Sequence, residues 1–184
     1  MLKAGPTSLP GVILVEPAAF PDARGYFTEL YHAQKYREVG IDCTFVQDNL
    51  SFSKRGVVRG LHHQFPSMQA KLIGVLAGEV FDVAVDIRVG SPTFGRWHSE
   101  ILSAENHRQL FVPAGFAHGF CVLSETATVS YKCSALYDPA GDSAILFDDP
   151  DIGIAWPELE LILSDKDLAA RPLREISLEK LPRF

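Results

Sequence analysis

The sequence predicts an all-β domain, a sandwich or jelly-roll barrel with a few short helices. Short runs rich in Val, Ile, Phe, Leu and Tyr recur along the chain, and turn signals such as PDARG, VGSPTFG and DPAGD separate them. This alternation is typical of many short strands. No long helical pattern lies between the runs, which disfavours a parallel sheet with crossover helices. A length of 184 residues fits one domain spanning residues 1–184.

The expected elements follow the apolar runs. Candidate strands are residues 11–16, 25–31, 43–51, 57–64, 70–77, 79–88, 97–102, 108–112, 119–123, 127–137 and 143–147. Residues 32–39 fit about two helical turns ended by Gly40, because glycine readily adopts the left-handed conformation that follows a helix. Residues 165–170 and 178–181 are expected to add about one turn each.

Composition and charge exclude several classes of function. The formal net charge is −6 and no basic run or stripe is present, so we expect no nucleic acid partner. The N-terminal apolar run is broken by Glu16 and Pro17 and is too short for a signal peptide or a membrane span. The sequence therefore predicts a cytoplasmic protein with no membrane partner.

The three cysteines are odd in number and widely spaced: Cys43, Cys121 and Cys133. Two of them lie in apolar, strand-like segments. We expect buried free thiols, with neither a disulfide framework nor a cysteine zinc site.

The stretch RGLHHQ at residues 59–64 suggests a metal site or acid/base chemistry. Successive residues of a strand point to opposite faces, so His62 and Gln64 are expected to share one face while His63 points away. Adjacent histidines on a strand therefore do not easily bind one ion.

A second histidine lies in VPAGFAHGF at residues 112–120. This segment contains P-x-G-x-x-H, which resembles the second motif of the cupin jelly rolls. Metal-binding cupins add an upstream H-x-H and a downstream Glu, whereas this chain has H-H. The resemblance implies a cupin-like barrel without a complete metal cage, so we expect no metal and no cofactor. Two readings stay open: a metal held by His62 and His118, and His118 as a hydrogen-bonded turn residue.

A longer series of segments carries a more specific resemblance, from about Val15 to Pro172. The segments are FPDARGYFTELY (20–31), FVQDNLS (45–51), VVRGLHHQ (57–64), QAKLIGVLAGEVFDVAVDIRVGSPTFGRW (69–97), RQLFVPAGFAHGF (108–120), VSYKCSALYDP (129–139) and LSDKD (163–167). Together they resemble the dTDP-4-dehydrorhamnose 3,5-epimerase family, which is metal-independent and has the cupin fold.

The resemblance implies epimerisation at carbons 3 and 5 of dTDP-4-dehydro-6-deoxy-D-glucose, in dTDP-L-rhamnose biosynthesis. Both carbons flank a carbonyl, so either can lose a proton to give an enolate. Inversion then needs a base on one face, a proton donor on the other, and a donor for the enolate oxygen.

The resemblance assigns four catalytic residues. His62 matches the general base, Tyr131 the proton donor and Lys71 the group at the keto oxygen. Asp167 matches the carboxylate that orients the base. For Asp167 a second reading stays open, because Ser164 followed three residues later by an acid is also a helix-capping pattern.

The resemblance also assigns a set of substrate-binding residues. Arg24 and Arg59 match phosphate ligands, Tyr137 the residue that stacks on thymine, and His118 a substrate contact. Period-two counting places Tyr131 and Tyr137 on one face, and an inward Asp82 is expected to pair with His118. Further binding positions are Glu29, Gln47, Asn49, Asp142 and Lys166.

Two features fit this assignment less well. Strict alternation places Arg59 and His62 on opposite faces, so a bulge, a strand end or a neighbouring subunit must intervene if both serve one pocket. Asp142 stands where the family often has Glu, which puts that contact at the nucleotide end in doubt.

Alternative functions remain open at this point. A single-carbon epimerase of a related dTDP-4-keto-6-deoxy sugar would carry the same catalytic residues. A metal-dependent cupin enzyme and a non-catalytic sugar-nucleotide-binding module are further candidates. The resemblance also implies a homodimer, which would protect exposed sheet edges.

Overall fold

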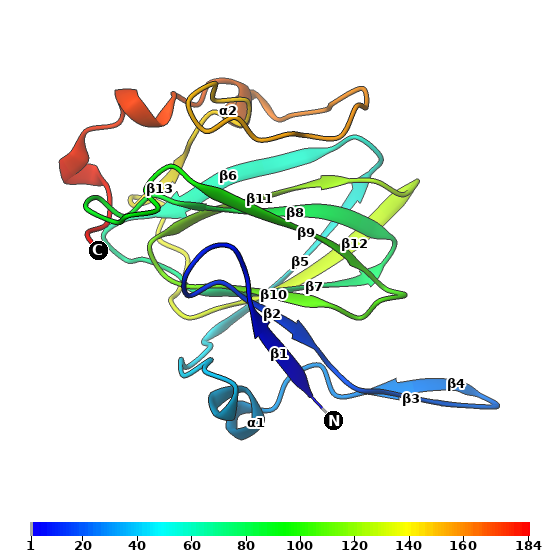
Figure 1. The fold of residues 1–184 in the computed structure, drawn as a ribbon. Coiled ribbons are helices and arrows are strands. Elements are labelled where there is room, and N and C mark those ends of the chain that lie inside the picture. Colours follow the sequence, from blue (N-terminus) through cyan, green and yellow to red (C-terminus); the bar gives the residue numbers. More distant parts are fainter. Residues whose placement is uncertain (1) are drawn as a thin grey trace.

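The computed structural model describes residues 2–184 and consists mainly of two antiparallel β-sheets packed face to face (Figure 1). In hydrogen-bonding order, the six-stranded sheet contains β1 (Lys3–Pro6), β2 (Ile13–Glu16), β10 (Gln109–Val112), β7 (Lys71–Ala77), β12 (Thr126–Cys133) and β5 (Gln47–Lys54). The five-stranded sheet contains β13 (Asp142–Ala144), β6 (Val58–Gln64), β11 (Phe116–Val122), β8 (Glu79–Asp86) and β9 (Trp97–Ser103). The predicted all-β sandwich is confirmed.

The helices are few and short. They are α1 (Ala33–Glu38), α2 (Asp165–Leu168) and the 3-10 turns η1 (Leu173–Glu175) and η2 (Leu178–Lys180). Gly40 follows α1 with φ +92°, as the sequence predicts. Within residues 2–184, no helix is long and apolar enough to cross a membrane.

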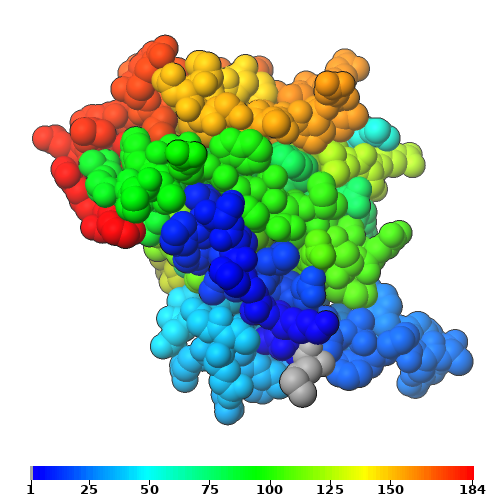
Figure 2. All heavy atoms as spheres, viewed as in Figure 1, coloured from blue at the N-terminus to red at the C-terminus, as the bar shows by residue number. Residues whose placement is uncertain are grey.

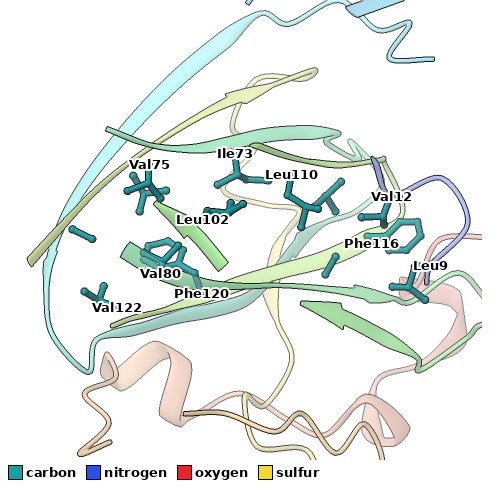
Figure 3. Packing of buried hydrophobic residues seen from close by; sticks show 14 residues of the cluster. Leu9, Val12, Ile73, Val75, Val80, Leu102, Leu110, Phe116, Phe120 and Val122 are labelled. Carbon is teal, nitrogen blue, oxygen red and sulfur yellow. The ribbon is translucent and has the colours of Figure 1, made fainter. Parts of the chain in front are cut away.

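The main core lies between the two sheets. Ile73, Val75 and Leu110 of the six-stranded sheet face Val80 and Phe120 of the five-stranded sheet (Figure 3). A second cluster lies on the outer face of the five-stranded sheet, where Val83, Val85 and Leu61 pack under Leu173 and Leu181. β8 therefore buries both of its faces, with Val80 and Ala84 on the inner face and Val83 and Val85 on the outer one.

A two-stranded hairpin, β3 (Ala19–Asp22) and β4 (Gly25–Thr28), extends away from the two sheets (Figure 1). It also projects from the body of the molecule in the space-filling view (Figure 2). Phe20, Tyr26 and Phe27 on this hairpin are 59%, 56% and 68% exposed. Phe20 and Phe27 are register partners and form an apolar surface on one face of the hairpin, whereas Tyr26 lies on the other face against His107.

Several predicted boundaries shift for identifiable reasons. β12 ends at Cys133 because its register partners, Gln47 of β5 and Lys71 of β7, are the first residues of their strands. The predicted strand over 127–137 is thus too long, and Tyr137 lies in the loop beyond it. β11 begins at Phe116, so His118 lies within a strand and not in a turn. The sequence missed β1 and β3, which contain Pro6 and Pro21 and lie at the edge of a sheet or in a hairpin.

The cysteine prediction is confirmed in part. Cys43, Cys121 and Cys133 are all free thiols; Cys121 and Cys133 are buried, whereas Cys43 is only half-buried.

Candidate active site

A pocket of about 210 Å³ opens between strands of the two sheets. It brings together eight predicted site residues: Gln47, Asn49, His62, Lys71, Tyr131, Tyr137, Asp142 and Lys166. Three further lining residues were not predicted: Gln64, Gln69 and His63, which was expected to point away from His62. The period-two pattern of RGLHHQ was a signal for Gln64, because it places Gln64 on the same face as His62.

A β-bulge in β6 brings Arg59 and His62 to the same side of the sheet. Their partners on β11 are Phe120 and His118, which are two positions apart, whereas Arg59 and His62 are three apart. Gly60 and Leu61 take up the extra position, and Leu61 packs on the outer face. Gly60 has φ +133°, and a Cβ there would lie 2.5 Å from the Cα of Gly119. The sequence required such an irregularity, and only glycine fits it.

His62 and Asp167 form a hydrogen-bonded pair at the pocket. The distance from His62 Nε2 to Asp167 Oδ1 is 2.6 Å, and the two side chains are 34% and 4% exposed. Burial raises the pKa of Asp167, but hydrogen bonds from His62, the Ser164 side chain and the Gly60 N–H outweigh it and hold that pKa below its usual value. The pair leaves His62 Nδ1 with a free lone pair when the imidazole is neutral.

Ser164 shows that the helix-capping reading of LSDKD holds. Its hydroxyl accepts a hydrogen bond from the backbone N–H of Asp167 at 3.2 Å and so caps α2. The carboxylate of Asp167 is turned to His62. One residue thus belongs to the helix cap through its backbone and to the site through its side chain.

Lys71 enters the pocket from the six-stranded sheet. Within residues 2–184, its Nζ has no hydrogen-bond or ion-pair partner. Burial lowers the pKa of Lys71, while the nearby Cys133, Asp142 and Asp82 oppose that shift. Lys71 is half-buried, and an ammonium that loses water contacts without gaining a partner is costly, so an oxygen atom of a bound ligand would stabilise it.

Tyr131 lies on β12 in the same sheet as Lys71, and its register partners are Asn49 and Ile73. Burial raises its pKa, which keeps the phenol protonated at neutral pH. His62 comes from the opposite, five-stranded sheet. The pocket is therefore lined by an imidazole on one wall and a phenol on the other.

The Asp82–His118 pair expected from the sequence is present. The Nε2 atom of His118 lies 2.9 Å from Asp82 Oδ2 and 3.0 Å from Oδ1, and the side chains are 9% and 0% exposed. His118 is the register partner of His62. It is not among the residues that line the pocket, so its substrate contact stays a prediction.

Tyr137 marks the mouth of the pocket and is 57% exposed. Its hydroxyl donates to Asp142 Oδ2 at 3.0 Å, and Lys166 Nζ donates to the same oxygen. Three predicted nucleotide-binding residues thus form one hydrogen-bonded chain, and the shorter Asp142 side chain reaches both partners.

The three remaining predicted residues lie outside the pocket lining. Arg59 donates to Ser53 Oγ at 3.0 Å, and its guanidinium opposes the rise in the pKa of Tyr131. Arg24 pairs with Asp22 in the β3–β4 turn, and Glu29 pairs with Lys35. Within a single chain, Arg24 and Glu29 are not brought to the site.

The described part of the chain, residues 2–184, contains no group of three His, Cys, Asp or Glu side chains that could hold a metal ion.

Comparisons with known proteins extend over nearly the whole chain. The family model for dTDP-4-dehydrorhamnose 3,5-epimerase matches residues 6–175. The dTDP-4-dehydrorhamnose 3,5-epimerase of Methanothermobacter thermautotrophicus is 53% identical over 172 residues, which cover 92% of this chain and 93% of the relative.

Solved structures agree with this similarity. A dTDP-6-deoxy-D-glucose-3,5-epimerase from Legionella pneumophila, in complex with dTDP-4-keto-L-rhamnose, has a TM-score of 0.98 and 49% identity, and the match covers 100% of this chain and 99% of that one. The 3′-monoepimerase ChmJ from Streptomyces bikiniensis, in complex with dTDP-quinovose, has a TM-score of 0.91 and 38% identity, covering 97% of this chain and 92% of that one. On the family model, the sequence relatives and the shared structure, this chain is an isomerase that belongs to the dTDP-4-dehydrorhamnose 3,5-epimerase family.

Proposed function

We propose that the protein epimerises carbons 3 and 5 of dTDP-4-dehydro-6-deoxy-D-glucose to give dTDP-4-dehydro-L-rhamnose, in dTDP-L-rhamnose biosynthesis. The observation that carries the proposal is the placement of His62 and Tyr131 on facing walls of one pocket, with Lys71 beside them. Inversion of a carbon requires removal of a proton from one face and its return to the other. Facing walls suit that requirement.

In the proposed mechanism, His62 Nδ1 takes the proton from carbon 3 or carbon 5. Asp167 accepts the hydrogen bond from Nε2, fixes the tautomer and stabilises the imidazolium that forms. The electron pair of the broken C–H bond moves to the carbonyl oxygen, and the Lys71 ammonium stabilises the resulting enolate oxygen. Tyr131 then donates its proton to the opposite face of the carbon. Exchange with water restores His62 and Tyr131, and the cycle repeats at the second carbon.

The nucleotide end of the pocket supports the assigned substrate. The exposed ring of Tyr137 is suited to stacking on thymine, and Arg59 supplies a guanidinium near Tyr131 for the diphosphate. Lys166 adds a second cation at the mouth.

Incubation of substrate in deuterium oxide tests the reaction. We expect product with deuterium at both carbon 3 and carbon 5, and no loss of activity after treatment with a chelator. Deuterium at one carbon only would instead support the single-carbon alternative, for which the similarity to a 3′-monoepimerase is the specific observation. Binding of dTDP without any exchange would support a non-catalytic binding module, and loss of activity on chelation would support a metal-dependent enzyme.

We also propose that the active unit is a homodimer in which the β3–β4 hairpin of one subunit reaches the pocket of the other. β5 is an edge strand that carries pocket residues. Its outward side chains Leu50 and Phe52 are 65% and 60% exposed, and Val46, just before the strand, is 51% exposed. The aromatic hairpin surface would cover such an edge. Arg24 and Glu29 would then arrive at a pocket that they cannot reach within their own chain.

Co-expression of two defective chains tests this arrangement. Arg24→Met and His62→Asn chains are each expected to have low activity, whereas mixed dimers would contain one complete site. Random assembly is expected to recover about one quarter of the parent activity. No recovery in mixed dimers that have been purified with two different tags would contradict the shared site.

A further inference from the structure

The loop after β12 holds Tyr137 at the mouth of the pocket without strand pairing to either sheet. β12 ends at Cys133, and Leu136 and Tyr137 are 66% and 57% exposed. An exposed irregular loop is ordinarily mobile, because few contacts oppose its conformational entropy. Something else must fix the loop if Tyr137 is to meet a nucleotide in one orientation.

The side-chain amide of Gln64 provides that anchor. Its Nε2 donates to the carbonyl of Leu136 at 3.1 Å, and its Oε1 accepts from the backbone N–H of Asp138 at 3.0 Å. The amide thus bonds the residue on each side of Tyr137 and replaces the strand that the loop lacks. Gln64 is only 7% exposed, so both bonds are shielded from water.

The anchor is itself held firmly. Gln64 Nε2 also donates to the carbonyl of Ser67 at 2.8 Å, and Ser67 Oγ donates to Asp138 Oδ2 at 2.8 Å. Tyr137 is further fixed through its backbone N–H, which donates to Gln47 Oε1 at 2.8 Å, and through its hydroxyl bond to Asp142. Tyr137 is therefore held at its backbone N–H and at its hydroxyl, and Gln64 fixes the backbone of the residues on each side of it.

Gln64 also links this loop to the base. It lies two positions after His62 on β6, on the same side of the strand, and its register partner is Asp142. The strand that carries the imidazole thus also carries the anchor for the stacking ring. The spacing between the two ends of the substrate is set along one rigid element.

We propose that Gln64 is a positioning residue that orders Tyr137 for stacking on the nucleotide base. This rests on the proposed function, in which Tyr137 stacks on thymine. Loss of two shielded hydrogen bonds in Gln64→Met is expected to raise the Kd for dTDP and the KM for substrate by roughly tenfold. The kcat at saturating substrate is expected to change by less than about threefold, because the proton-transfer groups stay in place.

A double-mutant cycle tests the proposal. The Kd for dTDP is measured by calorimetry for the parent protein, Gln64→Met, Tyr137→Ala and the double variant. If Gln64 acts by ordering Tyr137, Gln64→Met raises the Kd in the parent but has almost no effect in the Tyr137→Ala background. Gln34→Met, on the exposed surface of α1, is the matched control and is expected to bind dTDP like the parent.

Gln64→Glu is a second variant that tests the same role if Gln64→Met does not fold. It keeps the acceptor for the Asp138 N–H but opposes a carboxylate to the Leu136 carbonyl, and it is expected to give the same split between KM and kcat. An equal rise in Kd in both backgrounds, or no rise in the parent background, would overturn the role of Gln64. Failure of the parent protein to bind dTDP or to exchange substrate protons would instead overturn the proposed function.

Discussion

Two histidine–aspartate pairs lie on the five-stranded sheet and differ mainly in exposure. His62 and His118 are register partners on adjacent strands, and each bonds a carboxylate that is almost fully buried. The His62 side chain is 34% exposed at the pocket, whereas that of His118 is 9% exposed and is not among the residues that line the pocket. The same pairing thus presents an accessible imidazole in one place and a shielded one in the other.

Among the replacements that compare the two pairs, replacement of His62 is expected to have the largest effect on activity. His62→Asn removes the proposed base, and epimerisation and solvent deuterium exchange should fall by about 10³-fold, within the usual range for general-base catalysis. His32→Asn is the matched control, because asparagine can replace the helix-capping role of His32 on α1. A variant at His62 that exchanged protons at the parent rate would remove the distinction between the two pairs.

Replacement of the two carboxylates separates catalysis from stability. Asp82→Asn breaks a fully buried pair and is expected to lower the free energy of unfolding by about 3 kcal/mol in a urea titration. Asp167→Asn should cost less stability but lower kcat by on the order of 10²-fold, since His62 loses its orienting partner. Because its pKa is lowered in the fold, the stabilising effect of Asp167 is present above pH of about 4 and is lost as the pH falls below that value. If both variants lost the same stability and had equal kcat values, the assignment of Asp82 to stability and of Asp167 to catalysis would be contradicted.

His63 adds a histidine without a carboxylate partner. Burial, with the nearby Lys71, lowers its pKa to about 4, and its Nδ1 is buried without a hydrogen bond in the described chain. The unfolded chain binds a proton here at a higher pH than the folded chain does, so the free energy of unfolding falls as the pH drops from about 6.5 toward 4. The full loss is about 3 kcal/mol. His63→Phe should flatten this part of the stability curve, and parallel curves for the two proteins would contradict the prediction.

Replacement of Lys71 is expected to have the smallest effect on the free energy of unfolding, and to raise it where the replacements of Asp82 and Asp167 lower it. Lys71→Met should abolish most of the activity and yet raise the free energy of unfolding by about 1 kcal/mol, because a half-buried ammonium with no partner in residues 2–184 is removed. The pKa of Lys71 is lowered in the fold, so its cost is full below the folded-state pKa and disappears as the pH rises toward about 10.4. Chemical denaturation at pH 7 and pH 10 measures this difference. A less stable Lys71→Met protein at pH 7 would show that Lys71 has a stabilising partner.

The sequence predicted much of the pocket because short-range alternation and the family resemblance agree there. Gln47 and Asn49 were expected on one face, and both line the pocket opposite the exposed Asp48. Tyr137 was wrongly placed in a strand, because the end of β12 depends on where its partner strands begin. Local pattern could not predict which pocket Arg24 reaches, because an extended hairpin can contact its own chain or a second subunit.

The bulge at Gly60 and Leu61 has a consequence for how this protein can change. Many apolar side chains could replace Leu61 at modest cost, because it only fills space on the outer face. Gly60 is less replaceable, because a Cβ there would lie 2.5 Å from the Cα of Gly119. Deleting Leu61 would leave Arg59 and His62 two positions apart, as their partners Phe120 and His118 are, so regular alternation would still place both on the pocket side. Within this strand, the residue without a side chain therefore constrains change more strictly than the extra residue does.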